Sequence, residues 1–544
     1  MRRYFARWLK SISLEVINYP RVYLLLFLIL VLAFFVRVYR IEDLLGFYYD
    51  QGRDALVIWR LWHEGKFFLI GPVTGLSGIF LGPLYYYIIA PIYLLSAGSP
   101  ILPAVFLAFT ATVASFLLYY LGWKFHSRPT GIIAATIGAF SYFIVLAGRW
   151  LSNPTLILLS SMLLLLSMWK VVSYERRATG PKGLGPGGWW IAIALFVGVS
   201  LQFESASAVF YIPMIVVFAG WLGLRRMFLR EKGFLPNKKI FLISLAVFLA
   251  TLLPQILFNF RHDNLLIDNF KRVIVDDQSF RLPLKADTKF RLEYFWGVYH
   301  SKIFPGWQIY AILFSVLSAS VILASWKSFS KNKGVQLLLI FLGVPMLLYL
   351  TFYGNFGNIY DYYMSGYYLP MILLFSLGLG ELWKGKGGKL VVLFFFALFL
   401  LQNGSLNKNY LTATVLSRPI ALEDQLQAVD WVFDDASGRG DFNVDVYVPP
   451  VIPHAYDYLF LWQANLRHAS AVSSAESVQG KQGCERELCG MILDEQITLL
   501  YILYEADPPH PERLEAWLDK YIGSTVVEDE ARFGSITVQR RQRL

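Results

Sequence analysis

Long apolar runs separated by short polar loops fill most of the chain up to Gln402. An α-helix needs about twenty apolar residues to cross the hydrocarbon core of a bilayer, and these runs approach or reach that length. The pattern predicts an α-helical polytopic membrane protein with about 11 transmembrane helices. The expected spans are Val22–Val36, Ile101–Leu121, Ile132–Ala147, Pro154–Val171, Trp189–Phe203, Ala206–Leu224, Ile240–Phe258, Trp307–Trp326, Val335–Phe352, Ser365–Leu382 and Leu390–Gln402.

One further apolar segment, Pro83–Leu95, is short, contains Pro91 and is rich in tyrosine. If it crossed the membrane, the basic loops Trp123–Thr130 and Val172–Gly188 would lie on the outer side. If it lies flat on the outer surface, both loops face the cytoplasm, where Lys- and Arg-rich loops collect. We therefore expect a flat interfacial helix in the first outer loop, a setting that suits aromatic-rich amphipathic segments.

This topology places every lysine-rich short loop on the cytoplasmic side. The loops Arg225–Lys239, Trp326–Gly334 and Lys384–Lys389 carry six, three and three basic residues. We expect a cytoplasmic N-terminus, because Val22–Val36 is too long for a signal-peptide core and lacks a small-residue cleavage site. With an odd number of spans, the C-terminal region then lies outside the cell membrane. We expect the protein in the plasma (inner) membrane.

The region after Gln402 has a different pattern, in which short amphipathic and alternating segments follow one another. They predict a small extracytoplasmic α/β domain. The chain thus divides into a transmembrane domain at 1–402, with an outer loop at about 38–100, and a soluble domain at 403–544. The expected elements of the soluble domain are a helix at Ala421–Ala436, strands at Phe442–Val448 and Ile497–Tyr504, a short helix at Pro511–Tyr521 and a strand at Ser535–Gln539.

The composition agrees with this division. The chain is 56% hydrophobic and 16% charged, whereas a soluble domain carries about 25% charged residues. From Asn403 onward, 12 Lys and Arg stand against 21 Asp and Glu, while the preceding part carries 37 against 17. A basic part beside an acidic part indicates two environments on the two sides of a membrane, and not nucleic-acid binding.

Both cysteines, Cys484 and Cys489, lie in the acidic tail, five residues apart. A local disulfide fits an oxidising compartment, and two free thiols fit the sequence equally well. Two cysteines alone offer too few ligands for a metal site.

Ionisable residues gather in the predicted outer loops and are nearly absent from the centres of the spans. Asp50, Arg53 and Asp54 stand three and four residues apart, so on a helix they share one face. Arg149 and Arg261 lie just beyond the outer ends of later spans. Ion-coupled transporters usually carry ionisable residues at mid-membrane. The distribution therefore favours chemistry at the outer surface over transport.

Several motifs follow one another along the predicted membrane domain, namely DQGRDA, IGP, GIFLGPLYYYIIAP, GRWLSNP, FNFRHD and IYDYYMSGYYLP. This series resembles the GT-C superfamily of integral-membrane glycosyltransferases, in particular the bacterial branch related to protein O-mannosyltransferases and to aminoarabinose transferases of lipid A. The resemblance implies flat helices in the first outer loop, a polyprenyl-phosphate sugar donor, Asp50 as the catalytic residue and Arg53 as a ligand of the donor phosphate. The chain departs from the aminoarabinose transferases at LGPLYYY, where they carry a Glu-Lys pair connected with a metal site and a phosphate contact.

The residue types agree with this chemistry. A hydroxyl acceptor needs a general base, whereas a departing phosphate needs positive charge. One carboxylate therefore suffices for an inverting displacement, unlike the paired carboxylates of glycosidases. Asp50 is the expected base, and Asp54 the expected orienter of Arg53. Candidate phosphate ligands are Arg53, Arg149 and Arg261, because a guanidinium can hold phosphate oxygens in a bidentate fork.

Purely structural interpretations stand beside these. An ordinary intrahelical ion-pair network also explains the spacing of Asp50, Arg53 and Asp54. Arg149 is also explained by a side chain at the end of a span that extends so that its charged group reaches the membrane surface. The pattern of tyrosines that includes Tyr85 and Tyr362 favours an interfacial aromatic belt, although aromatic rings also stack on sugars. No dedicated metal-ligand cluster is visible, and a divalent ion shared by acidic residues and a phosphate is left open.

The sequence thus predicts transfer of a monosaccharide from polyprenyl phosphate to an acceptor hydroxyl on the outer face of the membrane. It does not identify the acceptor, which can be a glycan, a lipid or a protein. The alternative hypotheses are a transporter or flippase of lipid-linked glycans, a polysaccharide polymerase or ligase, and a scaffold whose exported tail binds partners.

Overall fold

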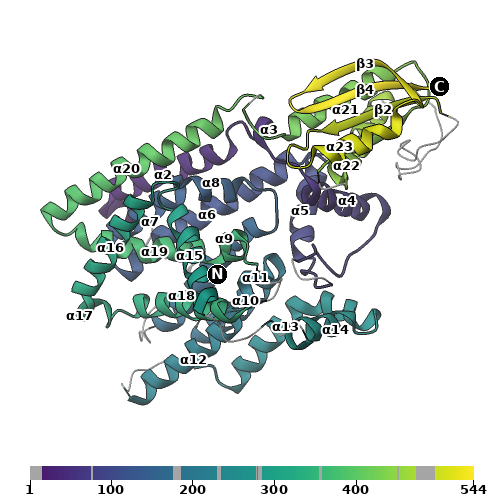
Figure 1. Cartoon of the computed structure of the whole chain (residues 1–544). Helices are drawn as coiled ribbons and strands as arrows, with labels where there is room; N and C mark the ends of the chain where they lie inside the picture. Colours follow the sequence, from purple (N-terminus) through teal and green to yellow (C-terminus); the bar gives the residue numbers. More distant parts are fainter. Residues whose placement is uncertain are drawn as a thin grey trace.

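The computed structural model describes residues 15–74, 78–174, 185–228, 235–276, 279, 285–353, 358–415, 417–449, 452–472 and 497–544. Cys484 and Cys489 lie outside the described residues. The described part is mostly helical, with a small four-stranded sheet near the C-terminus (Figure 1). The predicted fold class, a polytopic helical protein with a small C-terminal α/β domain, is confirmed.

Nine helices in the described part of the chain are long and apolar enough to cross a membrane, and a tenth candidate is the bent pair α7 and α8. The remaining predicted span is α16, which has 17 residues. Each of the eleven predicted spans therefore coincides with helical structure, and Ile132–Ala147 is divided between the bent pair α7 and α8. The nine are α2 (Pro20–Val38), α6 (Ile101–Phe125), α9 (Pro154–Val172), α10 (Pro186–Phe203), α11 (Ser205–Ala208) with α12 (Tyr211–Phe228), α13 (Lys238–Arg261), α18 (Lys333–Thr351), η3 (Asp361–Met364) with α19 (Ser365–Leu382), and α20 (Lys386–Leu411); α7 is Arg128–Phe140, α8 is Tyr142–Arg149 and α16 is Gln308–Ala324.

The bend of 62° between α7 and α8 is stabilised by buried polar side chains from other helices. Arg37 of α2 donates hydrogen bonds to the carbonyl oxygens of Gly138 (2.9 Å) and Ala139 (3.0 Å). Asn407 of α20 donates to the carbonyl oxygen of Phe140 (2.9 Å). These donors satisfy backbone groups that a broken helix leaves without intrahelical partners. The apolar run across the bend carries no sign of it, so the sequence predicts one straight span.

Two short helices follow the first span and form the loop that is predicted to lie on the outer side, called the outer loop below. They are α4 (Tyr49–Glu64) and α5 (Leu84–Leu95), preceded by the single turn α3 (Ile41–Leu44). The 12 residues of α5 extend about 18 Å at about 1.5 Å per residue, well short of the hydrocarbon core of about 30 Å. The length of α5 therefore agrees with a helix that lies on the membrane surface.

The loop between α4 and α5 is fastened to the membrane helices through two glutamines. Gln202 of α10 accepts a hydrogen bond from the backbone N–H of Leu84 (3.3 Å). Gln255 of α13 donates to the carbonyl oxygen of Phe80 (3.3 Å). The outer loop thus rests on the spans instead of projecting from them. The remaining elements of the membrane part are α14 (Leu265–Lys271), the π-helical η1 (Arg272–Asp276), α15 (Lys285–Ser301) and α17 (Trp326–Phe329).

The tail domain contains a four-stranded sheet in the order β1-β2-β4-β3, with β1 and β2 parallel and the other pairs antiparallel. In strand β2, Tyr501 and Leu503 belong to the main core, whereas Leu500 and Ile502 pack with Trp517 on the opposite face. Helices therefore cover both faces of the sheet. The elements are α21 (Leu422–Ala436), β1 (Asn443–Tyr447), α22 (His454–Val472), β2 (Leu499–Glu505), α23 (Pro511–Leu518), η4 (Asp519–Tyr521), β3 (Thr525–Phe533) and β4 (Ile536–Arg543).

All five elements predicted in the tail are present, and two further elements, α22 and β3, were not predicted. Strand β3 carries a run of acidic residues and is exposed along most of its length, so the alternation that marks a half-buried strand is missing. The last membrane helix, α20, continues to Leu411, past the predicted domain boundary at 402. Figure 1 shows the sheet domain at one end of the molecule, beside α3, α4 and α5.

Candidate functional site

The three charged residues of the DQGRDA motif lie in the first turns of α4 and form one cluster. Arg53 Nη1 lies 2.8 Å from Asp50 Oδ1. Arg53 Nε and Nη2 lie 3.0 and 2.8 Å from Asp54 Oδ1. The side chain of Asp54 is 4% exposed and that of Asp50 is 52% exposed. Asp50 is therefore the carboxylate of this cluster that a ligand can reach.

Asp54 fixes Arg53 from its buried side. Tyr86 of α5 donates a hydrogen bond to Asp54 Oδ1 (2.9 Å). Burial raises the pKa of Asp54 to about 6, and the charge of Arg53 opposes this shift. Burial lowers the pKa of Arg53, but the nearby acidic groups raise it more, so that the net shift is upward. Arg53 thus keeps its charge, and its hydrogen bonds to Asp54 hold the guanidinium group in one orientation.

A cavity of about 530 Å³ opens beside this cluster. Asp50 and Arg53 line it from α4, and Tyr362 lines it from η3. The rest of the wall is largely apolar and comes from the α4–α5 loop and from α10 to α13, including Phe248 and Leu252 of α13. A cavity with a polar corner and apolar walls suits a ligand that joins a charged head to a hydrocarbon chain.

Glu204 is a second carboxyl group in the wall of this cavity, and it was not among the predicted site residues. It is 5% exposed, and its side chain accepts a hydrogen bond from the backbone N–H of Ala206 (3.2 Å) at the start of α11. Burial raises the pKa of Glu204 to about 8. The protonated, neutral form of Glu204 is therefore favoured at neutral pH.

The other predicted site residues lie away from the cavity. Arg149 ends α8, is 5% exposed and lines a separate cavity beside the tail domain. Arg261 is exposed in the last turn of α13 and does not line the cavity. Tyr85 is buried within α5. The structure thus brings Asp50, Arg53 and Tyr362 together, with Asp54 directly behind Arg53.

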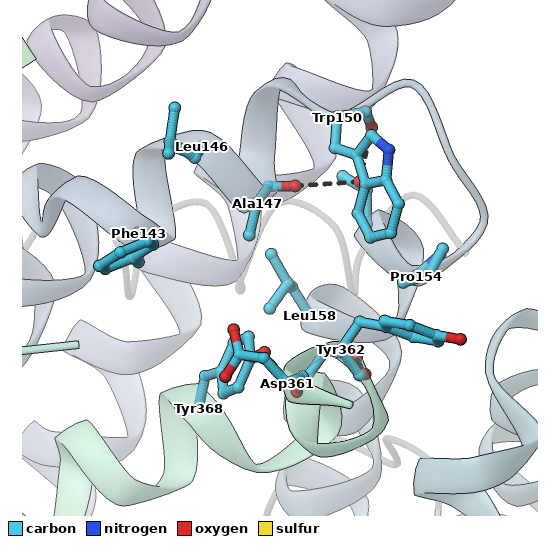
Figure 2. A pocket seen from close by; sticks show the side chains of 11 residues that line it. Phe143, Leu146, Ala147, Trp150, Pro154, Leu158, Asp361, Tyr362 and Tyr368 are labelled. Carbon is cyan, nitrogen blue, oxygen red and sulfur yellow. Dashed lines mark hydrogen bonds between the residues drawn. The ribbon is translucent and has the colours of Figure 1, made fainter. Parts of the chain in front are cut away.

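Figure 2 shows a smaller cavity, of about 230 Å³, next to the main one. Trp150, Pro154 and Tyr362 line both cavities. The rings of Trp150 and Tyr362 meet edge to face, with centroids 6.1 Å apart. Asp361 lines the smaller cavity and pairs with Lys302, whose Nζ lies 2.9 Å from its Oδ2. An aromatic pair thus stands where the two cavities adjoin.

Among the residues that the structure describes, no group of three or more His, Cys, Asp or Glu side chains is placed to hold a metal ion. Asp50 and Asp54 both pair with Arg53. A divalent ion held jointly by acidic residues and a phosphate ligand stays a prediction.

Comparison with known proteins finds similarity in structure and none in sequence. No protein-family model and no curated protein matches the chain. The crystal structure of ArnT from Cupriavidus metallidurans in the apo state matches with a TM-score of 0.55 at 10% identity, covering 95% of this chain and 97% of that one. The structure of the same protein bound to undecaprenyl phosphate matches with a TM-score of 0.54 and the same identity and coverage. The archaeal oligosaccharyltransferase AglB from Archaeoglobus fulgidus, at 11% identity and coverage of 90% and 70%, gives a TM-score of 0.46.

The likeness to ArnT extends over nearly the whole of both chains. The two chains therefore share a fold, and the fold that the motif resemblance implied is confirmed. The chain is a multi-pass membrane protein with this fold. At 10% identity this likeness shows a shared fold and not the roles of individual residues.

Proposed function

We propose that this chain is a membrane glycosyltransferase, which moves a monosaccharide from a polyprenyl-phosphate donor to an acceptor hydroxyl on the outer face of the plasma membrane. The observation that carries the proposal is the placement of Asp50 and Arg53 in one corner of a largely apolar cavity, 2.8 Å apart. A base and a phosphate ligand are the two groups that this reaction requires.

In the proposed reaction, Asp50 accepts the proton of the acceptor hydroxyl as its oxygen attacks the anomeric carbon. The bond between the anomeric carbon and the phosphate oxygen breaks, and the polyprenyl phosphate leaves with the electron pair. Arg53 stabilises the negative charge that grows on this phosphate. Asp54 and Tyr86 keep the guanidinium in place throughout. One attack on the face opposite the leaving group inverts the anomeric centre.

The apolar walls support a lipid-linked donor. Phe248, Leu252 and Phe270 give the cavity a surface on which a hydrocarbon chain can lie, and burial of each methylene contributes about 0.8 kcal/mol. The helix α13 that provides two of these side chains is largely exposed along its length, so it faces the lipid. The related fold of ArnT has been seen with undecaprenyl phosphate bound, which is a donor carrier of the proposed class.

The test is transfer of a radiolabelled sugar from polyprenyl phosphate in proteoliposomes. We expect Asp50→Asn to reduce kcat by about 100-fold or more with little change in the donor KM, because the base is lost and the shape is kept. We expect Arg53→Gln to raise the donor KM and also lower kcat. The matched control is Glu64→Gln, which removes a carboxylate from the far end of the same helix, where it pairs with Lys66.

Undiminished transfer by Asp50→Asn would remove Asp50 as the base. Movement of labelled lipid between leaflets without any acceptor product would instead favour the flippase hypothesis. Assays with a donor that carries one sugar and with a donor that carries many distinguish a monosaccharide transferase from a polymerase or ligase. Only a polymerase or ligase uses the donor with a long glycan.

A further inference from the structure

Two arginines are buried side by side in the membrane part without a carboxylate partner among the described residues. Arg37 is fully buried and donates only to backbone carbonyls. Arg149 donates through Nη1 to the carbonyl oxygens of Val36 (2.9 Å) and Tyr39 (3.0 Å). The Nη2 group of Arg149 is buried and has no hydrogen-bond partner in the described part of the chain. A buried cation of this kind is costly unless an anion accompanies it.

Arg149 lines a cavity of about 330 Å³ where the membrane part meets the tail domain. Its walls come from α8, from the segment before α4, from the end of α20 and from the connection that leads into α21. Arg418 lines the same cavity from that connection, and its Nε is also buried with no hydrogen-bond partner among the described residues. The other two nitrogens of Arg418 bind Asp424 at 2.6 and 2.9 Å, so the charge of Arg418 is balanced and that of Arg149 is not.

The cavity therefore holds two guanidinium groups, each with one nitrogen that has no hydrogen-bond partner among the described residues. Arg149 lies over the ring of Tyr410, with Cζ 5.3 Å from the ring centroid, and no carboxylate in the described part of the chain balances its charge. The hydroxyl of Tyr410 is a further polar group in the wall and donates to the carbonyl oxygen of Leu44 (3.3 Å). Trp150 and Leu146 give the wall apolar surface. Guanidinium groups match the geometry of phosphate oxygens, and apolar walls accept the carbon atoms attached to a phosphate ester.

We propose that this cavity binds a phosphate or phosphate ester group, which joins the membrane part to the connection of the tail domain through Arg149 and Arg418. The site is separate from the cavity of Asp50 and does not depend on the proposed transfer reaction. The phosphate can come from a lipid headgroup or from a soluble ion, and both share the same chemistry at the arginines.

The test measures thermal unfolding of the purified full-length protein in detergent against increasing inorganic phosphate, and separately against phosphatidylglycerol, with phosphatidylcholine as the neutral lipid. We expect a saturable rise of the unfolding temperature with at least one of the two anionic probes and none with phosphatidylcholine. Response to both probes identifies a site open to soluble phosphate, and response to phosphatidylglycerol alone identifies a lipid headgroup site.

Arg149→Gln should raise the concentration of the effective probe at half-maximal stabilisation by tenfold or more. Lys408→Gln is the matched control, because it removes one positive charge from the exposed face of α20, two residues from Tyr410 and outside the cavity. It should leave that concentration unchanged. Should Arg149→Gln fail to fold, Arg149→Lys keeps the charge, removes the fork and should still weaken the response severalfold.

Two results would overturn the proposal. One is the absence of stabilisation of the wild-type protein by either anionic probe. The other is an equal response of the wild-type protein and the Arg149 variants, which would assign the stabilisation to surface charge.

Discussion

At the scale of single residues, Glu204 shows how a buried carboxyl group takes a role opposite to that of Asp50. Its pKa of about 8 means that the neutral form occupies the cavity wall at neutral pH. We therefore expect Glu204→Gln to retain transfer activity within about threefold, because the amide replaces a neutral carboxyl and can still cap α11. Glu204→Ala removes the cap and opens the wall, so it should lower activity and stability together. Transfer assays and thermal unfolding of both variants check this.

The pH dependence of stability follows from the same residue. The folded-state pKa of about 8 lies above the ordinary value of 4.5, so the folded protein holds an extra proton between these values. Stability contributed by Glu204 is therefore present at low pH and is lost as pH rises through this range. Glu204→Gln should flatten the fall of unfolding temperature between about pH 5 and about pH 8. An unchanged slope in the variant would mean that Glu204 is ionised in the folded state.

Asp54 predicts a second dependence on pH, this time in donor binding. Its pKa of about 6 means that the cluster of Asp50, Arg53 and Asp54 loses one negative charge in mild acid, while Arg53 stays charged. An anionic donor then meets less repulsion. We expect the donor KM to fall severalfold as pH decreases through about 6. In Asp54→Asn the KM should stay level over this range. A fall of equal size in the variant would assign the effect to another group.

Sequence reasoning located the charged corner of the site, since Asp50, Arg53 and Asp54 are local in the chain and their spacing fixes a shared helical face. It missed Glu204, which lies at the break between α10 and α11 and is buried in the wall of the cavity. It also grouped Arg149 with Arg53 as candidate ligands of one donor phosphate, whereas the structure places the two arginines in different cavities. Arg149 follows the bend between α7 and α8, which is stabilised by Arg37 and Asn407 from distant parts of the chain.

At the scale of elements, the unpredicted helix α22 explains a glycine inside the DQGRDA motif. A Cβ atom at Gly52 would collide with the backbone of His454 and Ala455 at the start of α22. Further along α22, Trp462 Nε1 donates to the carbonyl oxygen of Ala97 (2.8 Å), in the turn after α5. The tail domain thus contacts α4 directly and α5 through the turn that follows it. The sequence of the tail domain shows that α22 contains aromatic residues. It does not show that they pack on α4 and α5, because those helices lie some four hundred residues earlier in the chain.

This contact predicts that Gly52→Ala loosens the tail from α4, even though alanine favours helices. We expect a lower unfolding temperature and faster release of a tail fragment by protease. Gly343→Ala in α18 is the matched control, because a Cβ atom there meets nothing within 4 Å. It should be neutral or slightly stabilising, by up to about 1 kcal/mol. Equal protease resistance of Gly52→Ala and the wild-type protein would contradict direct packing of α22 on α4.

At the scale of the whole molecule, the apolar pattern predicted the helices of the membrane part well. A long apolar run that lies in lipid must satisfy its backbone hydrogen bonds internally, and a helix does this within one segment. Each predicted span coincides with helical structure, and the short segment before residue 96 is too short to cross. The core of the tail domain is continuous with that of the membrane part: Phe47 of the outer loop and Tyr458 of α22 pack with ring centroids 5.9 Å apart. This continuity couples the outer loop to the tail and could not be read from either segment alone.

The sidedness of the molecule is the last prediction, and two exposed lysines allow a direct test. Lys66 follows α4 and Lys384 follows α19, with side chains 64% and 61% exposed. If α5 lies flat, eleven crossings place Lys66 outside, and the basic loop that contains Lys384 inside. With Cys484 and Cys489 replaced by serine, a membrane-impermeant maleimide should label Lys66→Cys in intact cells. It should label Lys384→Cys only after the membrane is opened. Labelling of both positions in intact cells would mean that a segment between them that is taken as a span does not cross. Protection of Lys66→Cys in intact cells would contradict the assignment of Asp50, in the same loop, to the outer face.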